Sequence, residues 1–149
     1  MSDIRFYQLG LRPLEQALAV MLERCYERKQ RALVQAGSPE RVEDLADRLW
    51  TYRDRSFLPH GTAKDGQAAH QPIWLTAEPE NPNGAEVLFL TDGAEREVLT
   101  DFALVAVLFD GGDPDGLQAA RDYWKRLRDC GSALTYWAED ESGRWTQKA

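Results

Sequence analysis

Short apolar runs alternate along this chain with segments whose apolar residues recur at helical spacing. Runs rich in β-branched and aromatic residues predict strands at residues 3–9, 31–36, 71–76, 86–90, 103–109 and 134–138. The run at 103–109 is continuously apolar, which is typical of a central strand buried on both faces of a sheet. The chain therefore offers enough strand segments for one large sheet.

Three segments between these runs predict helices. The first follows Pro13, which suits the first turn of a helix, and carries apolar residues at helical spacing as far as Cys25. The second starts at Ser38, whose hydroxyl can cap the first turn, and buries a stripe that ends at Leu49. The third spans about residues 115–130 and stops at Gly131.

Strands separated by helical segments predict an α/β fold of three layers, with a mostly parallel sheet and helices on both faces. The hairpin-like spacing around residues 71–93, with a turn cluster at 78–84, suggests that part of the sheet is antiparallel. Residues 95–101 are too short to assign, and no element is expected in the tail that contains Trp145. A length of 149 residues predicts a single domain over residues 1–149.

Composition narrows the class of function. The formal charge of −7 argues against direct binding of duplex DNA, because phosphates are held mainly by Lys and Arg. Cys25 and Cys130 are the only cysteines and form no metal-binding spacing, so a reducing cytoplasm is the expected compartment. We see no signal peptide, and no apolar run approaches the roughly 20 residues that cross a bilayer, so no membrane contact is expected.

The sequence offers little catalytic chemistry. The first strand–helix turn has one glycine, Gly10, where dinucleotide-binding proteins carry a glycine-rich fingerprint, and no P-loop occurs. The glycines at 111–116 are interrupted by aspartates that would repel a phosphate. His60 and His70 are the only histidines, and His60 fits a turn better than a catalytic base. We therefore predict no catalytic residue, no cofactor and no metal site.

The last predicted helix does offer a binding pattern. Arg121, Lys125 and Arg128 share one face at i, i+4 and i+7, and Tyr123 and Trp124 flank this row. A basic row beside an aromatic ring on an acidic protein suits an anionic ligand with an apolar group, since a guanidinium can grip a carboxylate. The alternative is a solvated helix of mixed charge with its indole turned inward.

A second stretch, residues 49–62, carries the aromatic residues Trp50 and Phe57 near a turn closed by Pro59, His60 and Gly61. We hypothesise that this stretch meets the basic helix to form one peptide-binding surface. Aromatic residues at the end of a helix are more often part of the core, and that interpretation stays open.

The segments Leu49-Trp50, Ser56–His60, Arg121–Lys125 and Leu134–Trp137 together resemble the chi subunit of bacterial DNA polymerase III. The strand Ile4–Tyr7 and the region Asn81–Asp92 agree with it, so the resemblance covers nearly the whole chain. It implies a Rossmann-like fold without catalytic activity. It also implies an accessory subunit that links the clamp loader, directly or through psi, to the single-stranded-DNA-binding protein.

In that family the subunit holds the acidic C-terminal tail of the single-stranded-DNA-binding protein. Carried over by position, the tail pocket would use Arg121, Trp124 and Lys125, with Trp50 and Phe57 nearby. The aromatic residue of this helix is commonly a tyrosine in the family, and Trp124 keeps the ring without the hydroxyl. The competing hypothesis is a small α/β nucleotide-binding or hydrolytic enzyme whose fingerprint has diverged.

Overall fold

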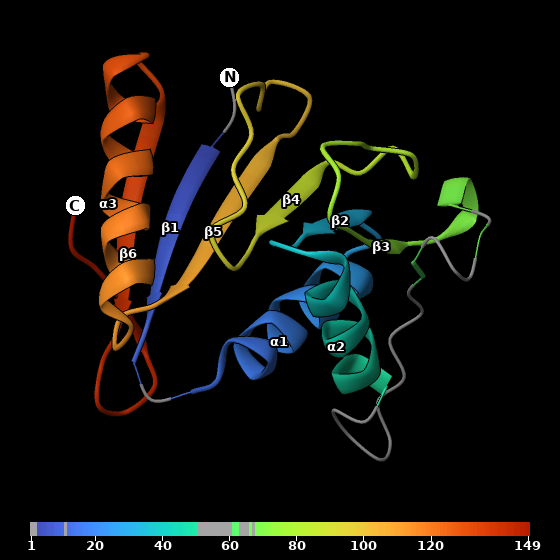
Figure 1. Cartoon of the computed structure of the whole chain (residues 1–149), viewed down its shortest axis with the longest axis horizontal. Coiled ribbons are helices and arrows are strands. Elements are labelled where there is room, and N and C mark those ends of the chain that lie inside the picture. The colour runs from blue at the N-terminus through green and yellow to red at the C-terminus, as the bar shows by residue number, and fades with distance from the viewer. Residues whose placement is uncertain (1–2, 11, 51–60, 63–65, 67) are drawn as a thin grey trace.

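The described residues of the chain build one seven-stranded sheet with three α-helices (Figure 1). The computed structural model describes residues 3–10, 12–50, 61–62, 66 and 68–149. The strand order is β3-β2-β4-β5-β1-β6-β7. The strands are β1 (Asp3–Leu9), β2 (Ala32–Gln35), β3 (Ile73–Thr76), β4 (Val87–Leu90), β5 (Leu104–Asp110), β6 (Ala133–Glu139) and β7 (Trp145–Gln147). The helices are α1 (Leu14–Glu27), α2 (Pro39–Trp50) and α3 (Pro114–Asp129), with a 3₁₀ turn at Ala68–His70.

Two apolar layers hold the helices on opposite faces of the sheet. On one face, α1 and α2 bury Leu18, Leu22 and Leu45 against alternate residues of the strands. On the other face, α3 packs over β1, β5 and β6, and Figure 1 shows it at the far side of the sheet from α2. The prediction of a three-layer α/β fold with helices on both faces is therefore confirmed.

The second face is completed by irregular chain rather than by another helix. Leu99, from the segment 95–101 that sequence analysis left unassigned, and Phe102, which follows it, enter the same apolar layer as α3. The Arg96 guanidinium lies over the Phe102 ring, 5.2 Å from its centroid, and Arg96 Nε donates to Gln35 Oε1 at 2.5 Å. This segment therefore covers the strands that α3 does not reach.

The sheet is mostly parallel as predicted, but its antiparallel part lies elsewhere. The expectation of antiparallel strands around residues 71–93 was wrong: β3 and β4 lie on either side of β2 and are both parallel to it. Residues 77–86 carry the chain back across β2, and Asn83 Nδ2 anchors them by donating to the carbonyls of Ala32 and Gln71, both at 3.1 Å. The antiparallel pair is β6 with β7, in the tail where no strand was expected.

The tail forms a strand because its indole has a place to pack. The ring of Trp145 lies 5.0 Å from that of Tyr7 at 67°, and the Arg12 guanidinium stands 5.8 Å from the indole centroid. Asp140 Oδ1 accepts from the amides of Ser142 and Arg144, at 2.8 and 2.9 Å, which shapes the turn between β6 and β7. In the described part of the chain, no helix has the length and apolarity needed to cross a bilayer.

Candidate functional site

Helix α3 carries the side chains that sequence analysis selected, and its ends are well defined. Asp113 precedes it and its carboxylate accepts from the amide of Asp115 at 3.2 Å, while Pro114 opens the first turn. Gly131 ends it with φ of 81°, in the left-handed region that glycine adopts at little cost. The buried stripe is Ala120, Tyr123 and Leu127.

Tyr123 belongs to the core, so the expectation that it flanks the basic row was wrong. It keeps 5% of its surface exposed. Its hydroxyl donates to the carbonyl of Arg96 at 2.9 Å and accepts from the Arg96 amide at 3.3 Å. Burial raises the pKa of Tyr123. The phenol therefore ties α3 to the irregular segment that covers the sheet.

Trp124 lies at the boundary between core and solvent. Its indole is partly buried and meets two rings edge to face: Phe6 at 5.2 Å and 82°, and Tyr136 at 5.7 Å and 79°. No hydrogen-bond acceptor for the indole N–H is found among the described residues. The ring thus lines the seam between α3 and β6, with its edge fixed by neighbours on β1 and β6.

Arg121 and Lys125 are exposed and lie three residues before and one residue after Trp124 on the same helix. Within the described residues neither has an ion-pair partner. Two other cations of α3 do have partners there: Arg126 pairs with Glu95, and Arg128 Nε lies 3.9 Å from Asp129 Oδ1. Within the described part of the protein, nothing neutralises the positive charges of Arg121 and Lys125, so they remain available to a ligand.

The phenol of Tyr136 on β6 has a raised pKa. Burial raises the pKa of Tyr136, and the positive charge of Arg121 acts in the opposite direction. Tyr136 donates a hydrogen bond to Gln8 Oε1. Arg121 precedes Trp124 by three residues, a spacing that places both on the same side of α3.

Most of the second predicted stretch lies outside the described residues. Trp50 ends α2, which covers the face of the sheet opposite α3 (Figure 1). Phe57 and His60 lie outside the described residues. Helix α3 carries Arg121, Trp124 and Lys125, and the hypothesis that these residues form one peptide-binding surface with Trp50 and Phe57 stays a prediction.

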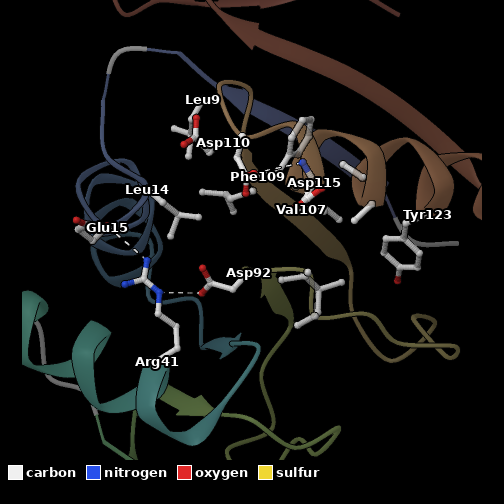
Figure 2. A pocket seen from close by; sticks show the side chains of 18 of the residues that line it. Leu9, Leu14, Glu15, Arg41, Asp92, Val107, Phe109, Asp110, Asp115 and Tyr123 are labelled. Atoms are coloured by element: carbon white, nitrogen blue, oxygen red, sulfur yellow. Dashed lines mark hydrogen bonds and ion pairs between the residues drawn. The ribbon is translucent and has the colours of Figure 1, made fainter.

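A cleft of about 770 Å³ opens at the carboxyl ends of β1, β4 and β5 (Figure 2). The strands β1 and β5 are neighbours, but the helices that follow them, α1 and α3, cover opposite faces of the sheet. Open α/β sheets bind ligands where successive connections diverge in this way. Sequence analysis did not identify the cleft, because its walls come from four separate parts of the chain.

The strand–helix turn on the first side of the cleft is closed by the protein's own carboxylate. Glu139 Oε1 accepts from the backbone amides of Gly10 and Arg12, both at 3.1 Å. Its other oxygen pairs with Arg12 Nε, and none of the Glu139 side chain is exposed. Nucleotide-binding proteins use such first-turn amides for phosphate. Here they hold Glu139, which sequence analysis missed because 127 residues separate it from Arg12.

The turn on the second side, between β5 and α3, is also lined by acids. Asp110 accepts from the amide of Gly112 at 2.8 Å, and Asp113 caps α3. The backbone amides that a phosphate would use at these two turns therefore already donate to carboxylates of the protein. Among the described residues, no three histidine, cysteine or carboxylate side chains gather in a way that would hold a metal ion.

Comparisons with known proteins agree on one family. A family model described as DNA polymerase III chi subunit, HolC, matches residues 1–135. A protein of Rickettsia prowazekii (strain Madrid E), named probable DNA polymerase III subunit chi, is 31% identical over 117 residues. That alignment covers 74% of this chain and 71% of the relative. The family match includes all of α3 and ends within β6.

Proposed function

The chain belongs to the family of DNA polymerase III chi subunits, and we propose that it acts as a non-catalytic accessory subunit of replication. In this proposal it links the clamp loader, directly or through psi, to the single-stranded-DNA-binding protein. The link is made by holding that protein's acidic C-terminal tail on the outer face of α3. The protein works as one domain in the cytoplasm and makes no direct contact with duplex DNA.

The observation that carries this proposal is the pair of exposed cations beside the partly exposed indole of Trp124. Arg121 and Lys125 lack ion-pair partners in the described residues, and Trp124 offers an apolar edge and an N–H donor. A terminal carboxylate would take the guanidinium, and the apolar last side chain of the tail would rest against the ring. The acids upstream in the tail would be attracted by the local positive charge.

The competing interpretation, a nucleotide-using or hydrolytic enzyme, gains no support from the geometry. The Glu139 carboxylate fills the first-turn amides, and Asp110 and Asp113 lie at the second turn. An enzyme of that kind predicts that a nucleoside triphosphate raises the melting temperature. We expect no such rise, and a rise of several degrees would favour the enzyme instead.

The proposal is tested by titrating the full chain with an acidic peptide that ends in an apolar residue. Arg121→Ala should weaken binding about tenfold or more, because it removes a charge-assisted hydrogen bond. Arg126→Ala is the matched control: the same substitution on the same helix, at a residue already paired with Glu95. It should change affinity by less than about threefold, mostly through the general field.

Salt provides the second measurement. Raising the ionic strength from about 50 to 300 mM should weaken binding of the wild-type chain, since exposed charges are screened. Equal binding by wild type and Arg121→Ala, or equal losses in Arg121→Ala and Arg126→Ala, would exclude the α3 surface as the tail site. Circular dichroism of each variant would show that the fold is retained.

A further inference from the structure

The cleft at the strand ends has an apolar floor. Leu9 and Leu90 end two of the strands that form it, and Val107 and Phe109 from β5 lie between them. Leu14 of α1 contributes to one wall (Figure 2). Its volume of about 770 Å³ falls within the roughly 300–1,000 Å³ of sites that hold drug-sized ligands. The floor is therefore suited to an apolar group and is large enough for more than one side chain.

Charges around this floor are strongly one-sided. Six carboxylates line the cleft, against the two guanidinium groups of Arg12 and Arg41. Both guanidinium groups already have carboxylate partners: Arg12 pairs with Glu139, and Arg41 reaches Glu15 and Asp92 at 3.5 and 3.0 Å. Figure 2 shows Arg41 between these two acids, on the wall opposite α3. The cations of the cleft are thus neutralised within the protein.

Three of the six carboxylates have no cationic partner among the described residues: Asp110, Asp113 and Asp115. Asp110 and Asp113 accept only backbone amides, from Gly112 and Asp115. All three side chains are exposed along the wall where β5 leads into α3. An incoming cation would meet carboxylates that are accessible and not yet compensated by charge.

We propose that this cleft docks a basic segment of a partner protein, in which an arginine or lysine stands next to an apolar residue. The cation would bind Asp110 and Asp115, and the apolar neighbour would lie on the floor formed by Leu9, Val107 and Phe109. Charge complementarity selects this occupant: the carboxylates exclude an acidic tail, and the apolar floor distinguishes a peptide from a simple polyamine. The inference does not depend on tail capture by α3.

The docking site is tested on the full ¹⁵N-labelled chain with a capped pentapeptide of alternating leucine and arginine. Its addition should shift the backbone amides of Gly10 and of residues 92–95, 110–113 and 115–116, which surround the cleft. A peptide with glutamate in place of arginine should leave them unchanged. The double variant Asp110→Asn with Asp115→Asn should weaken binding about fivefold or more, through the loss of two ion pairs.

The matched control is Asp122→Asn with Asp129→Asn, which removes two exposed carboxylates from α3 outside the cleft lining and gives the same net charge. It should change affinity by less than about twofold. Three results would overturn the inference: no shift at the cleft amides, equal weakening in the two double variants, or spermine binding the same amides as tightly as the peptide. Binding of an acidic peptide at Arg121 should be retained in Asp110→Asn with Asp115→Asn, so failure of one site is distinguishable from failure of the other.

Discussion

Helix α3 presents two regions of opposite charge. Along its outer face, it exposes Arg121 and Lys125, close in sequence to Trp124, whose ring meets Tyr136 of β6. At its start, Asp113 and Asp115 border the cleft at the strand ends. Both regions combine exposed charges with an apolar neighbour, but one suits an anionic partner and the other a cationic one.

The difference shows which charges serve the helix itself. Acids at the N-terminus of a helix are favoured by its dipole, and Asp113 in addition caps the first turn. Arg121 and Lys125 lie in the middle of α3, where the dipole has little effect and where no described residue pairs with them. Helix stability thus accounts for part of the acidic region and for none of these two cations, which strengthens the case for a ligand there.

The largest expected effect comes from removing the Glu139 carboxylate, which neutralises Arg12 at the edge of the cleft. Glu139→Ala would remove the acceptor of the Gly10 and Arg12 amides and the carboxylate partner of the Arg12 guanidinium. We expect the free energy of unfolding to fall by about 3–4 kcal/mol, measured by urea denaturation. Phosphate should then stabilise the variant more than the wild type, because the turn amides become available to an anion.

The control for Glu139 is Glu141→Ala, which removes an exposed carboxylate from the same hairpin. It should change stability by less than about 0.5 kcal/mol. If Glu139→Ala lowers stability as little as Glu141→Ala, this side chain does not hold the first turn. The contrast between the acidic cleft and the α3 surface with Arg121 and Lys125 would then be weakened.

Trp124 should give the next largest effect. Trp124→Ala removes edge-to-face contacts with Phe6 and Tyr136 and should lower the free energy of unfolding by about 2–3 kcal/mol, since the ring is only partly buried. Trp124→Phe should restore most of the stability and only part of any tail binding, because the indole N–H is gone. If Trp124→Ala, measured at a temperature where it is folded, binds the tail as tightly as the wild type, the Trp124 ring is not part of the tail site.

The smallest effect is a titration at Tyr136. Removing the charge in Arg121→Ala should raise the pKa of Tyr136 further, because Arg121 opposes the effect of burial. Because the raised pKa marks a neutral form favoured by folding, the contribution of Tyr136 to stability is full below about pH 10 and is lost as pH rises above it. Tyrosine ring NMR resolves this residue, and an unchanged pKa would place Arg121 away from β6.

The elements of this fold were largely predictable because each follows from local pattern. The apolar run at 103–109 became the central strand β5, and Pro13, Ser38 and Gly131 mark helix ends close to those observed. The pairing of strands was harder to predict from the sequence: the spacing of β3 and β4 matches a hairpin, yet β2 lies between them. Short spacing limits how far the chain can travel, but it does not determine which strand becomes the neighbour.

The candidate sites divide in the same way. Spacing on one helix predicts that Arg121, Trp124 and Lys125 share one surface. It could not decide which of Tyr123 and Trp124 enters the buried stripe, because that depends on what β1, β6 and the irregular segment place opposite them. The cleft forms where segments distant in sequence come together at the ends of strands. The spacing of apolar residues along the chain does not reveal which segments do so.

The position of β1 in the sheet has a consequence for how the newly made protein matures. This strand is synthesised first, yet its neighbours are β5 and β6, and the carboxylate that closes its turn comes from Glu139. Most of the chain must leave the ribosome before β1 finds either neighbour. Folding should therefore be late and slow for its size, as is usual where contacts join distant parts of a chain. Until then the apolar residues of β1 stay open to chaperones.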